Sequence, residues 1–250
     1  MSRPTPAETV TFGEQARRVI WYLDILMIGG VVAGLLAAGA GGRLAMRLLA
    51  VTAGDDAQGR ITEADEVVGE ISVGGTIGFV VFGGLFAGLV AAVIYLAFRR
   101  WLPSGRLGAL ALAGLLLVSL GTQVEPLRSD NPDFDLVGPD WLAESVFTAL
   151  AVLHTFVLFA VMARVSRSLP LFDGTRRIAL AYLPLVLLLP TAVIGTAVVV
   201  VLMVGAAVST RPAVRGVWAD PRLLVAGRGV IALAALVALP SFVTTIADIL

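Results

Sequence analysis

The single histidine of the chain, His154, lies midway along an apolar stretch of about residues 141–163. Glu144, Thr148 and Thr155 recur there at helical spacing, so they form one stripe with His154 at its edge. Ionisable groups inside a membrane span are candidates for function, and histidine gains and loses a proton near neutral pH. The stripe predicts a path for a proton or small solute, with Glu144 at its mouth. The alternative is a structural, neutral His154 that hydrogen bonds to a facing side chain or carbonyl group.

Two aspartates lie near the ends of the apolar part of the chain, Asp24 in its first span and Asp248 in its last. If both chain ends lie on one side of the membrane, these carboxyl groups share a depth and could form an acid pair. One member would stay protonated, because two like charges do not both ionise cheaply. The alternative is that each aspartate pairs with an arginine in the headgroup region, such as Arg17 or Arg18.

Two arginines, Arg43 and Arg47, follow the first span in the stretch GGRLAMRLLAVTAG. They lie one helical turn apart among apolar residues, which favours a continuation of the first helix beyond the membrane over a separate interfacial turn. The next loop is acidic and contains Glu63 and Glu66. Cations at a membrane boundary need counterions, so we expect Arg43 and Arg47 to pair with these acids and hold the loop over the helices.

Both long polar loops, 54–70 and 123–140, are rich in acidic residues. Thr62, followed by Asp65 and Glu66, predicts an N-cap that opens a short helix with an acidic first turn. The first loop lacks the alternating acids and fixed glycine of a calcium loop, and prolines interrupt the second. We therefore expect solvated loops with no metal and no cofactor, although a divalent cation remains an alternative.

Composition narrows the class of protein. The chain is 58% hydrophobic and 14% charged, with a mean hydropathy of +0.94, which is typical of a polytopic membrane protein and excludes a nucleic-acid partner. Without cysteine there is no disulfide, no thiolate nucleophile and no cysteine-bound metal, and one histidine makes a zinc or haem site improbable. No Walker sequence or membrane-protease motif is present. All 18 basic residues are arginine, which indicates a GC-rich bacterial source.

Six apolar stretches are long enough to cross a bilayer, and each must be helical because lipid offers no partner for an open strand edge. Their approximate ranges are 19–40, 75–98, 107–122, 141–163, 178–208 and 229–250. The third is short and the fifth is long. Pro184 and Pro190 interrupt the fifth, so we expect that span to be bent or steeply tilted.

The distribution of arginine sets the predicted topology. With a cytoplasmic tail at residues 1–18, alternation of six spans places ten arginines inside and eight outside, a small majority of the expected sign. The outer loops are then about 43–73, 123–140 and 209–228. We predict an all-α bundle that forms one transmembrane domain over residues 19–250, with both termini cytoplasmic. Tryptophans at span ends, including Trp21, support the boundaries.

Small residues recur every four positions in the first two spans, including Gly30 and Gly34, then Gly84 and Gly88, as well as Gly74 and Gly78. This spacing lets helix backbones approach closely in a membrane. We expect these faces to pack within the chain, with contact to a second copy or another membrane protein as the alternative.

The stretches GGRLAMRLLAVTAG, GGTIGFVVFGGLFAGLVAAVIYLAFRRWLP and DFDLVGPDWLAESVFTAL resemble a family of uncharacterised multi-pass membrane proteins from actinobacteria-like genomes. The resemblance covers roughly residues 29–170. It implies the membrane topology and brings no activity.

Three functions follow from these observations. The favoured one is permeation of a small solute or proton across the bacterial cytoplasmic membrane, as part of a larger assembly or alone. The second is an enzyme that acts on a lipid or isoprenoid, with Asp24, Glu144 or Asp248 as general acid. The third is a structural protein that stabilises a partner through its glycine faces. The two halves show no clear inverted repeat, which counts against a standard secondary transporter.

Overall fold

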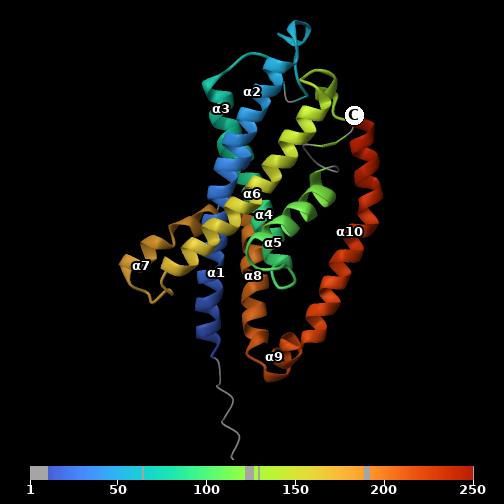
Figure 1. Ribbon diagram of the computed structural model, residues 1–250. Helices are drawn as coiled ribbons and strands as arrows, with labels where there is room; N and C mark the ends of the chain where they lie inside the picture. The colour runs from blue at the N-terminus through green and yellow to red at the C-terminus, as the bar shows by residue number, and fades with distance from the viewer. Residues whose placement is uncertain (1–10, 64, 122–126, 129, 189–191, 250) are drawn as a thin grey trace, which may run out of the picture.

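The computed structural model describes residues 11–63, 65–121, 127–128, 130–188 and 192–249, which form helices joined by turns and loops (Figure 1). The predicted all-α class is confirmed. The helices are α1 (Phe12–Ala33), α2 (Gly42–Thr52), α3 (Val73–Gly78), α4 (Gly84–Phe98), α5 (Gly105–Leu116), α6 (Asp140–Ser168), α7 (Arg176–Ala181), α8 (Ala192–Ser209), α9 (Pro212–Ala219) and α10 (Pro221–Ile249). Segments of wider, π-helical geometry join α1 to α2 (Gly34–Gly41) and α3 to α4 (Phe79–Gly83), and extend α5 (Leu117–Gly121).

Four helical stretches within the described residues are long and apolar enough to cross a membrane. They are Phe12–Thr52, Val73–Phe98, Asp140–Ser168 and Pro221–Ile249. A fifth is reached if Val199–Ser209 and Pro212–Ala219, bent by 101°, count as one span. The apolar helix Gly105–Gly121 is shorter, as its sequence predicts. The structure thus agrees with a multi-pass membrane protein and gives four or five candidate spans where six were predicted.

The first helix is one rod of 41 residues, Phe12–Thr52, that runs through its π-helical segment without a break. It begins seven residues before the expected boundary at about 19, because Thr11 and Glu14 cap it reciprocally. The Glu14 amide donates to Thr11 Oγ1 at 3.3 Å, and the Thr11 amide donates to Glu14 Oε2 at 3.0 Å. The rod carries Arg43 and Arg47, so the predicted continuation of the first helix is confirmed.

The glycine faces of α1 and α4 pack against each other. A Cβ atom on Gly30 would lie 2.8 Å from the carbonyl oxygen of Gly88, and one on Gly34 would overlap the carbonyl oxygen of Gly84. Gly30 and Gly34 therefore pack within the chain against Gly84 and Gly88. A Cβ atom on Gly74 or Gly78 would meet nothing within 4 Å, and contact with a second copy or a partner stays a prediction.

One end of the molecule gathers aromatic and arginine side chains from distant parts of the chain. Trp21 Nε1 donates to the carbonyl oxygen of Leu169 at 2.8 Å, and the neighbouring Tyr22 ring lies 3.9 Å from the guanidinium of Arg99. The ring centroids of Trp101 and Trp218 are 6.4 Å apart. We call this region, with the start of α1, the turn 99–104, the end of α6 and α9, the arginine end.

The opposite end carries the loops 53–72 and 127–139, and we call it the acidic end (Figure 1). Arg128 contacts Glu63 at 2.6 Å, and Gly138 packs on Leu49 of α2, which joins the two loops to the end of the first rod. The described part of α10 finishes at this end.

The contacts at the arginine end bear on the predicted topology. Leu169 and Trp218 both lie there, and Trp218 packs on Trp101 of the turn 99–104. These contacts favour a hairpin over a single span of residues 178–208, and the number of crossings stays a prediction. The physical reason for a hairpin is a broken helix: a 3₁₀ segment, Leu183–Leu188, follows α7, because Pro184 supplies no amide for a continuous α-helix. Pro190 lies outside the described residues.

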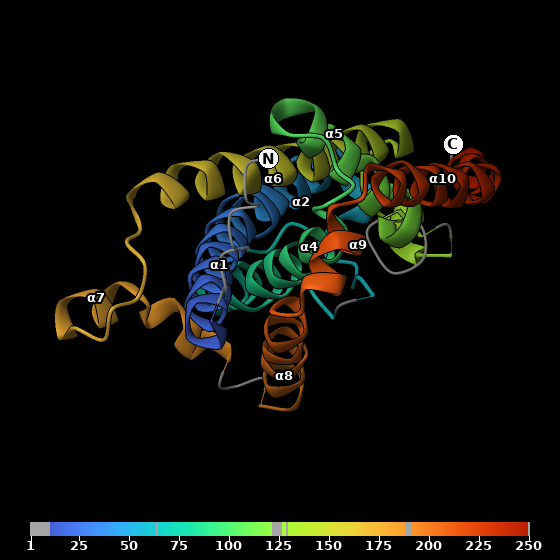
Figure 2. The same cartoon turned by 90° about the horizontal axis from the view of Figure 1, so that it is seen from below.

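The last helix differs from expectation in two ways. It begins at Pro221 instead of about 229, and it leads away from the arginine end, so its described part finishes at the opposite end of the structure from the start of α1 (Figure 1). Viewed from below, α1, α4 and α6 lie together, while α7, α8 and α10 lie around them (Figure 2). The main core cluster includes Ile25, Leu112 and Leu158, each at most 1% exposed.

Candidate functional site

Asp24 is the most deeply enclosed ionisable side chain in the described residues, with no exposed surface. It lies on α1, one turn inside Trp21. Neither of its carboxylate oxygens has a hydrogen-bond partner in the described part of the chain. Enclosing a carboxylate without a donor costs several kcal/mol, on the order of the desolvation of an ion, unless a proton or a cation compensates it.

The packing of α1 fixes the direction in which Asp24 points. Gly29 meets Leu158 and Met162 of α6, whereas Gly30 meets α4. At about 100° per residue, Asp24 lies about 140° from Gly29 and about 120° from Gly30 around the helix, so it faces a third side. The 3₁₀ segment Leu183–Leu188 and α8 also contact α1. We call residues 176–188 and 192–209 the broken segment. Its parts Leu183–Leu188 and α8 lie against α1, so they are the elements available to cover this third side.

The start of the broken segment is anchored beside Asp24. The hydroxyl group of Tyr182 donates to the carbonyl oxygen of Pro170 at 2.8 Å, and its ring packs edge-on against Phe172 at 5.4 Å. Tyr182 is buried, and its phenol lies within electrostatic reach of the Asp24 carboxyl group. The loop after α6 thus fixes the position of Tyr182, from which the 3₁₀ segment Leu183–Leu188 runs along α1.

His154 and Thr155 are both buried in α6, at 6% and 0% exposure. The Thr155 hydroxyl donates to the carbonyl oxygen of Val152 at 2.9 Å, and His154 Nε2 has no partner among the described residues. Glu144 and Thr148 are partly exposed. Burial thus increases along α6 from Glu144 to Thr155, in the order of the predicted path. The structure does not bring Glu144 into contact with His154. That these residues line a path stays a prediction.

The predicted acid pair of Asp24 and Asp248 is wrong. Asp248 is exposed near the end of α10 at the acidic end, whereas Asp24 is enclosed beside Trp21 of the arginine end (Figure 1). The error follows from the assumed sixth crossing, because a helix that leads away from the arginine end carries Asp248 with it. The acids named for lipid chemistry, Asp24, Glu144 and Asp248, therefore do not form one site.

The expected pairing of Arg43 and Arg47 with Glu63 and Glu66 is also wrong. Arg43 Nε donates to the hydroxyl group of Thr76 at 3.2 Å, and Arg47 is exposed. Glu63 instead accepts two bonds from Arg128, at 2.6 and 2.7 Å.

Further contacts between the two loops explain why the loop 53–72 is held by Arg128 and not by the arginines of α2. The amide of Glu63 donates to Asp133 Oδ1 at 2.8 Å, so both ends of this residue engage the second outer loop. The Glu66 amide donates to Thr62 Oγ1. The two acidic loops therefore brace each other, and the rod contributes little charge to them.

The short helix predicted to begin at Thr62 is absent from the described residues. Ile61 pairs with Val67, and the Thr62 amide donates to the Glu66 carbonyl oxygen at 2.9 Å, which makes a tight hairpin. Asp65 has a φ of 58°, a left-handed conformation that aspartate tolerates and that interrupts a right-handed helix. In the described part of the chain no group of three acidic or histidine side chains is placed to hold a metal ion.

Asp24 was one of several acidic candidates by sequence, and its enclosure was not visible there. Only the interruption near Pro184 offered a signal, since non-helical backbone at membrane depth occurs where it is buried in protein or lines a cavity. The cluster at the arginine end was only partly foreseen, because the sequence placed Trp21, Trp101 and Trp218 at span ends without bringing them to one end.

Comparison with protein-family models, with curated proteins and with solved structures finds no match to this chain. The resemblance to actinobacteria-like membrane proteins therefore receives no support from a matching family, and function has to be argued from the site itself.

Proposed function

We propose that this protein is a bacterial cytoplasmic-membrane protein that lets a proton or small cation permeate, with Asp24 as the group that binds it. The observation that carries the proposal is the Asp24 carboxyl group, fully enclosed and without a hydrogen-bond partner in the described residues. Ionisable residues are costly inside a membrane and mark ion or proton pathways when they occur there.

The broken segment supports this role. It starts and ends at the arginine end, so it enters and leaves from one side as a re-entrant hairpin. Interrupted helices of this kind contribute to ion-binding sites in transporters, where unwound backbone supplies carbonyl groups. Here the interruption, Leu183–Leu188, packs on α1, the helix that carries Asp24.

The charge distribution supports an orientation with the arginine end in the cytoplasm. With the broken segment as a hairpin, four arginines of the described residues lie at the acidic end: Arg43, Arg47, Arg60 and Arg128. In the proposed topology the others fall on the opposite side: Arg17, Arg18, Arg99, Arg100, Arg106, Arg164, Arg167, Arg176, Arg177, Arg211, Arg215, Arg222 and Arg228. This bias is much stronger than the ten against eight of six alternating spans. Crossings by α1, α3–α4, α5, α6 and α10 complete the proposed topology.

The polar residues of α6 supply a second stage of the proposed route. Gly29 meets Met162 and Gly41 meets Leu150, so the antiparallel seam of α1 and α6 places His154 between these two levels. This seam puts His154 level with about Ala37 of the rod, which at 1.5 Å per residue lies about 20 Å along the rod from Asp24. That gap is too long for direct proton transfer, so a route through both groups requires water between them.

The test is flux through proteoliposomes that contain the full chain, measured for protons with an enclosed pH dye and for sodium with a sodium dye. Asp24→Asn should lower the flux of the permeating ion by about tenfold or more, because a positioned proton-transfer group contributes at least that much. The matched control is Asp248→Asn, which changes the same residue type at an exposed position of α10 and should leave the flux unchanged.

Equal flux in wild type and Asp24→Asn, with both folded, would overturn the proposal. Flux no higher than that of empty liposomes for both ions would do the same. His154→Phe separates the stages: reduced flux at unchanged thermal stability assigns His154 to the route, whereas reduced stability at unchanged flux assigns it a structural role.

A further inference from the structure

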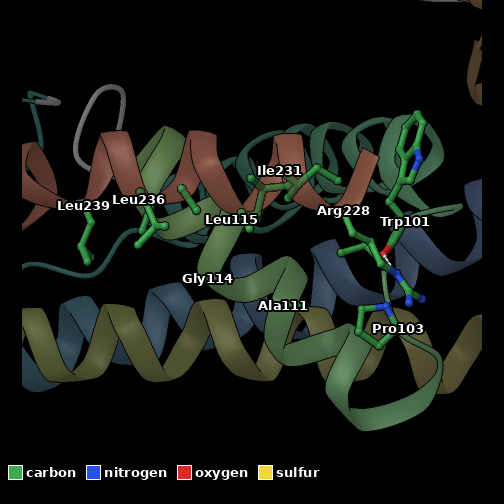
Figure 3. A pocket seen from close by; sticks show the side chains of 13 residues that line it. Trp101, Pro103, Ala111, Gly114, Leu115, Arg228, Ile231, Leu236 and Leu239 are labelled. Atoms are coloured by element: carbon green, nitrogen blue, oxygen red, sulfur yellow. Dashed lines mark hydrogen bonds between the residues drawn. The ribbon is translucent and has the colours of Figure 1, made fainter. Parts of the chain in front are cut away.

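The last helix stands off from the bundle across an apolar groove. None of the residues in its most apolar window is buried, and a groove of about 440 Å³ separates it from α5 and the π-helical extension of α5. Figure 3 shows the two walls, with Ala111 and Leu115 on one side and Ile231 and Leu239 on the other. Gly114 and Ala235 are small residues, so they leave space between the two walls.

One end of this groove is polar. Arg228 lies there, and its Nε donates to the carbonyl oxygen of Trp101 at 3.1 Å (Figure 3). The Arg228 side chain is otherwise exposed, and no carboxylate pairs with it among the described residues. The indole nitrogen of Trp101 is buried against Gly227 of α10 and does not open into the groove. The groove therefore begins at a cation at the arginine end and continues as hydrocarbon.

The length of the groove matches one leaflet. From Arg228 to Leu239, α10 rises about 16 Å, which is about half of the roughly 30 Å hydrocarbon core. A groove of about 440 Å³ spread over that length is narrow, which suits an extended acyl chain.

We propose that this groove binds one anionic glycerophospholipid of the cytoplasmic leaflet, with an acyl chain between α5 and α10 and the phosphate at Arg228. The inference goes beyond permeation, and its assignment to the cytoplasmic leaflet rests on the orientation proposed above. Basic pockets between transmembrane helices on the cytoplasmic side recognise anionic headgroups, and Arg228 supplies the cation here. The bound lipid supplies the contact that α10 lacks with the rest of the bundle.

The test counts lipids retained by the purified full chain in native mass spectrometry, after delipidation and addition of phosphatidylglycerol or phosphatidylcholine with identical acyl chains. Wild type should retain one phosphatidylglycerol, and phosphatidylcholine at least about fivefold less. Arg228→Gln should reduce phosphatidylglycerol retention by about fivefold, the equivalent of about 1 kcal/mol for one arginine near the membrane surface. Arg222→Gln is the matched control, since it removes an exposed arginine of the same helix end that does not line the groove.

A second pair of variants tests the acyl chain and does not depend on the folding of Arg228→Gln. Ala235→Phe fills the groove and should abolish retention, whereas Val237→Phe, at an exposed position of α10 outside the groove, should not. Equal losses in Arg228→Gln and Arg222→Gln, or unchanged retention in Ala235→Phe, would overturn the proposal. A dimeric mass that Ala235→Phe converts to a monomer would also overturn it, because a second copy would then occupy the groove.

Discussion

The crossing of α1 and α4 gives a sharp quantitative prediction through Gly34. A methyl group added at Gly34 meets backbone atoms of Gly84 and Gly88, which cannot rotate away as a flexible side chain could. The two helices must therefore separate, and every contact along the seam lengthens with them. We expect Gly34→Ala to destabilise the protein by about 1–3 kcal/mol, the usual cost of overpacking a well-fitted contact.

That free energy corresponds to a drop in Tm of about 2–12 °C, from roughly 2–4 °C per kcal/mol for a chain of this size. The chain offers a matched control in Gly78→Ala. Gly78 has the same four-residue spacing to Gly74 that Gly34 has to Gly30, but a Cβ atom there would meet nothing within 4 Å. Alanine is the better helix former, so the control should leave Tm unchanged or raise it slightly.

The assay is thermal denaturation of both variants in the same detergent, followed by tryptophan fluorescence and by the fraction that stays monodisperse. A Tm for Gly34→Ala within error of that for Gly78→Ala would refute the reasoning, because it would mean that the backbones of α1 and α4 do not touch. A loss of monodispersity in both variants would point instead to the spacing itself as the cause.

Two further predictions concern the arrangement of the chain and its dependence on pH. Because the protein contains no cysteine, single cysteines report sidedness directly: Thr210→Cys and Ser104→Cys should both resist an impermeant thiol reagent in intact cells, and Asp133→Cys should react, whereas labelling of Thr210→Cys would contradict the hairpin. The Thr175 amide donates to Asp173 Oδ1 at 2.8 Å and holds the pKa of this exposed carboxyl group below its ordinary value. The stabilisation is present above the pKa of the unfolded chain and is lost as the pH falls through the lower folded pKa. Asp173→Asn should therefore flatten the fall of Tm below about pH 4, and an unchanged slope would show that the turn contributes nothing.

Hydropathy was sufficient to locate most of the membrane-length helices, because the cost of an unpaired backbone in lipid leaves few alternatives to a helix. It also located the interruption at Pro184, since a missing amide breaks a helix wherever it falls. Hydropathy does not determine whether an apolar segment crosses the membrane or turns back to the side from which it entered. A largely apolar stretch of 31 residues at 178–208 suits one tilted span or a hairpin equally well by sequence, and the contact of Trp218 with Trp101 favours the hairpin.

The candidate site was harder to predict for a related reason. Asp24 and Asp248 have similar sequence surroundings, and their difference lies in what covers them, which is a property of helix order and not of local pattern. The same holds for Gly34 and Gly78. Among the loops, Arg43 looked like the natural partner of Glu63, but Arg128 holds that acid because the second outer loop folds over the first.

The π-helical segment Gly34–Gly41 has a consequence for the phase of the first rod. Widening eight residues of an α-helix delays its winding by about 100°, the angle that one residue normally contributes. The residues that precede this segment face the α4 crossing at Gly30. The residues that follow it face α3, where Arg43 contacts Thr76. The two halves of the rod therefore differ in helical phase by about one residue. Each half can face its own neighbours, although a continuous α-helix would not face both sets at once.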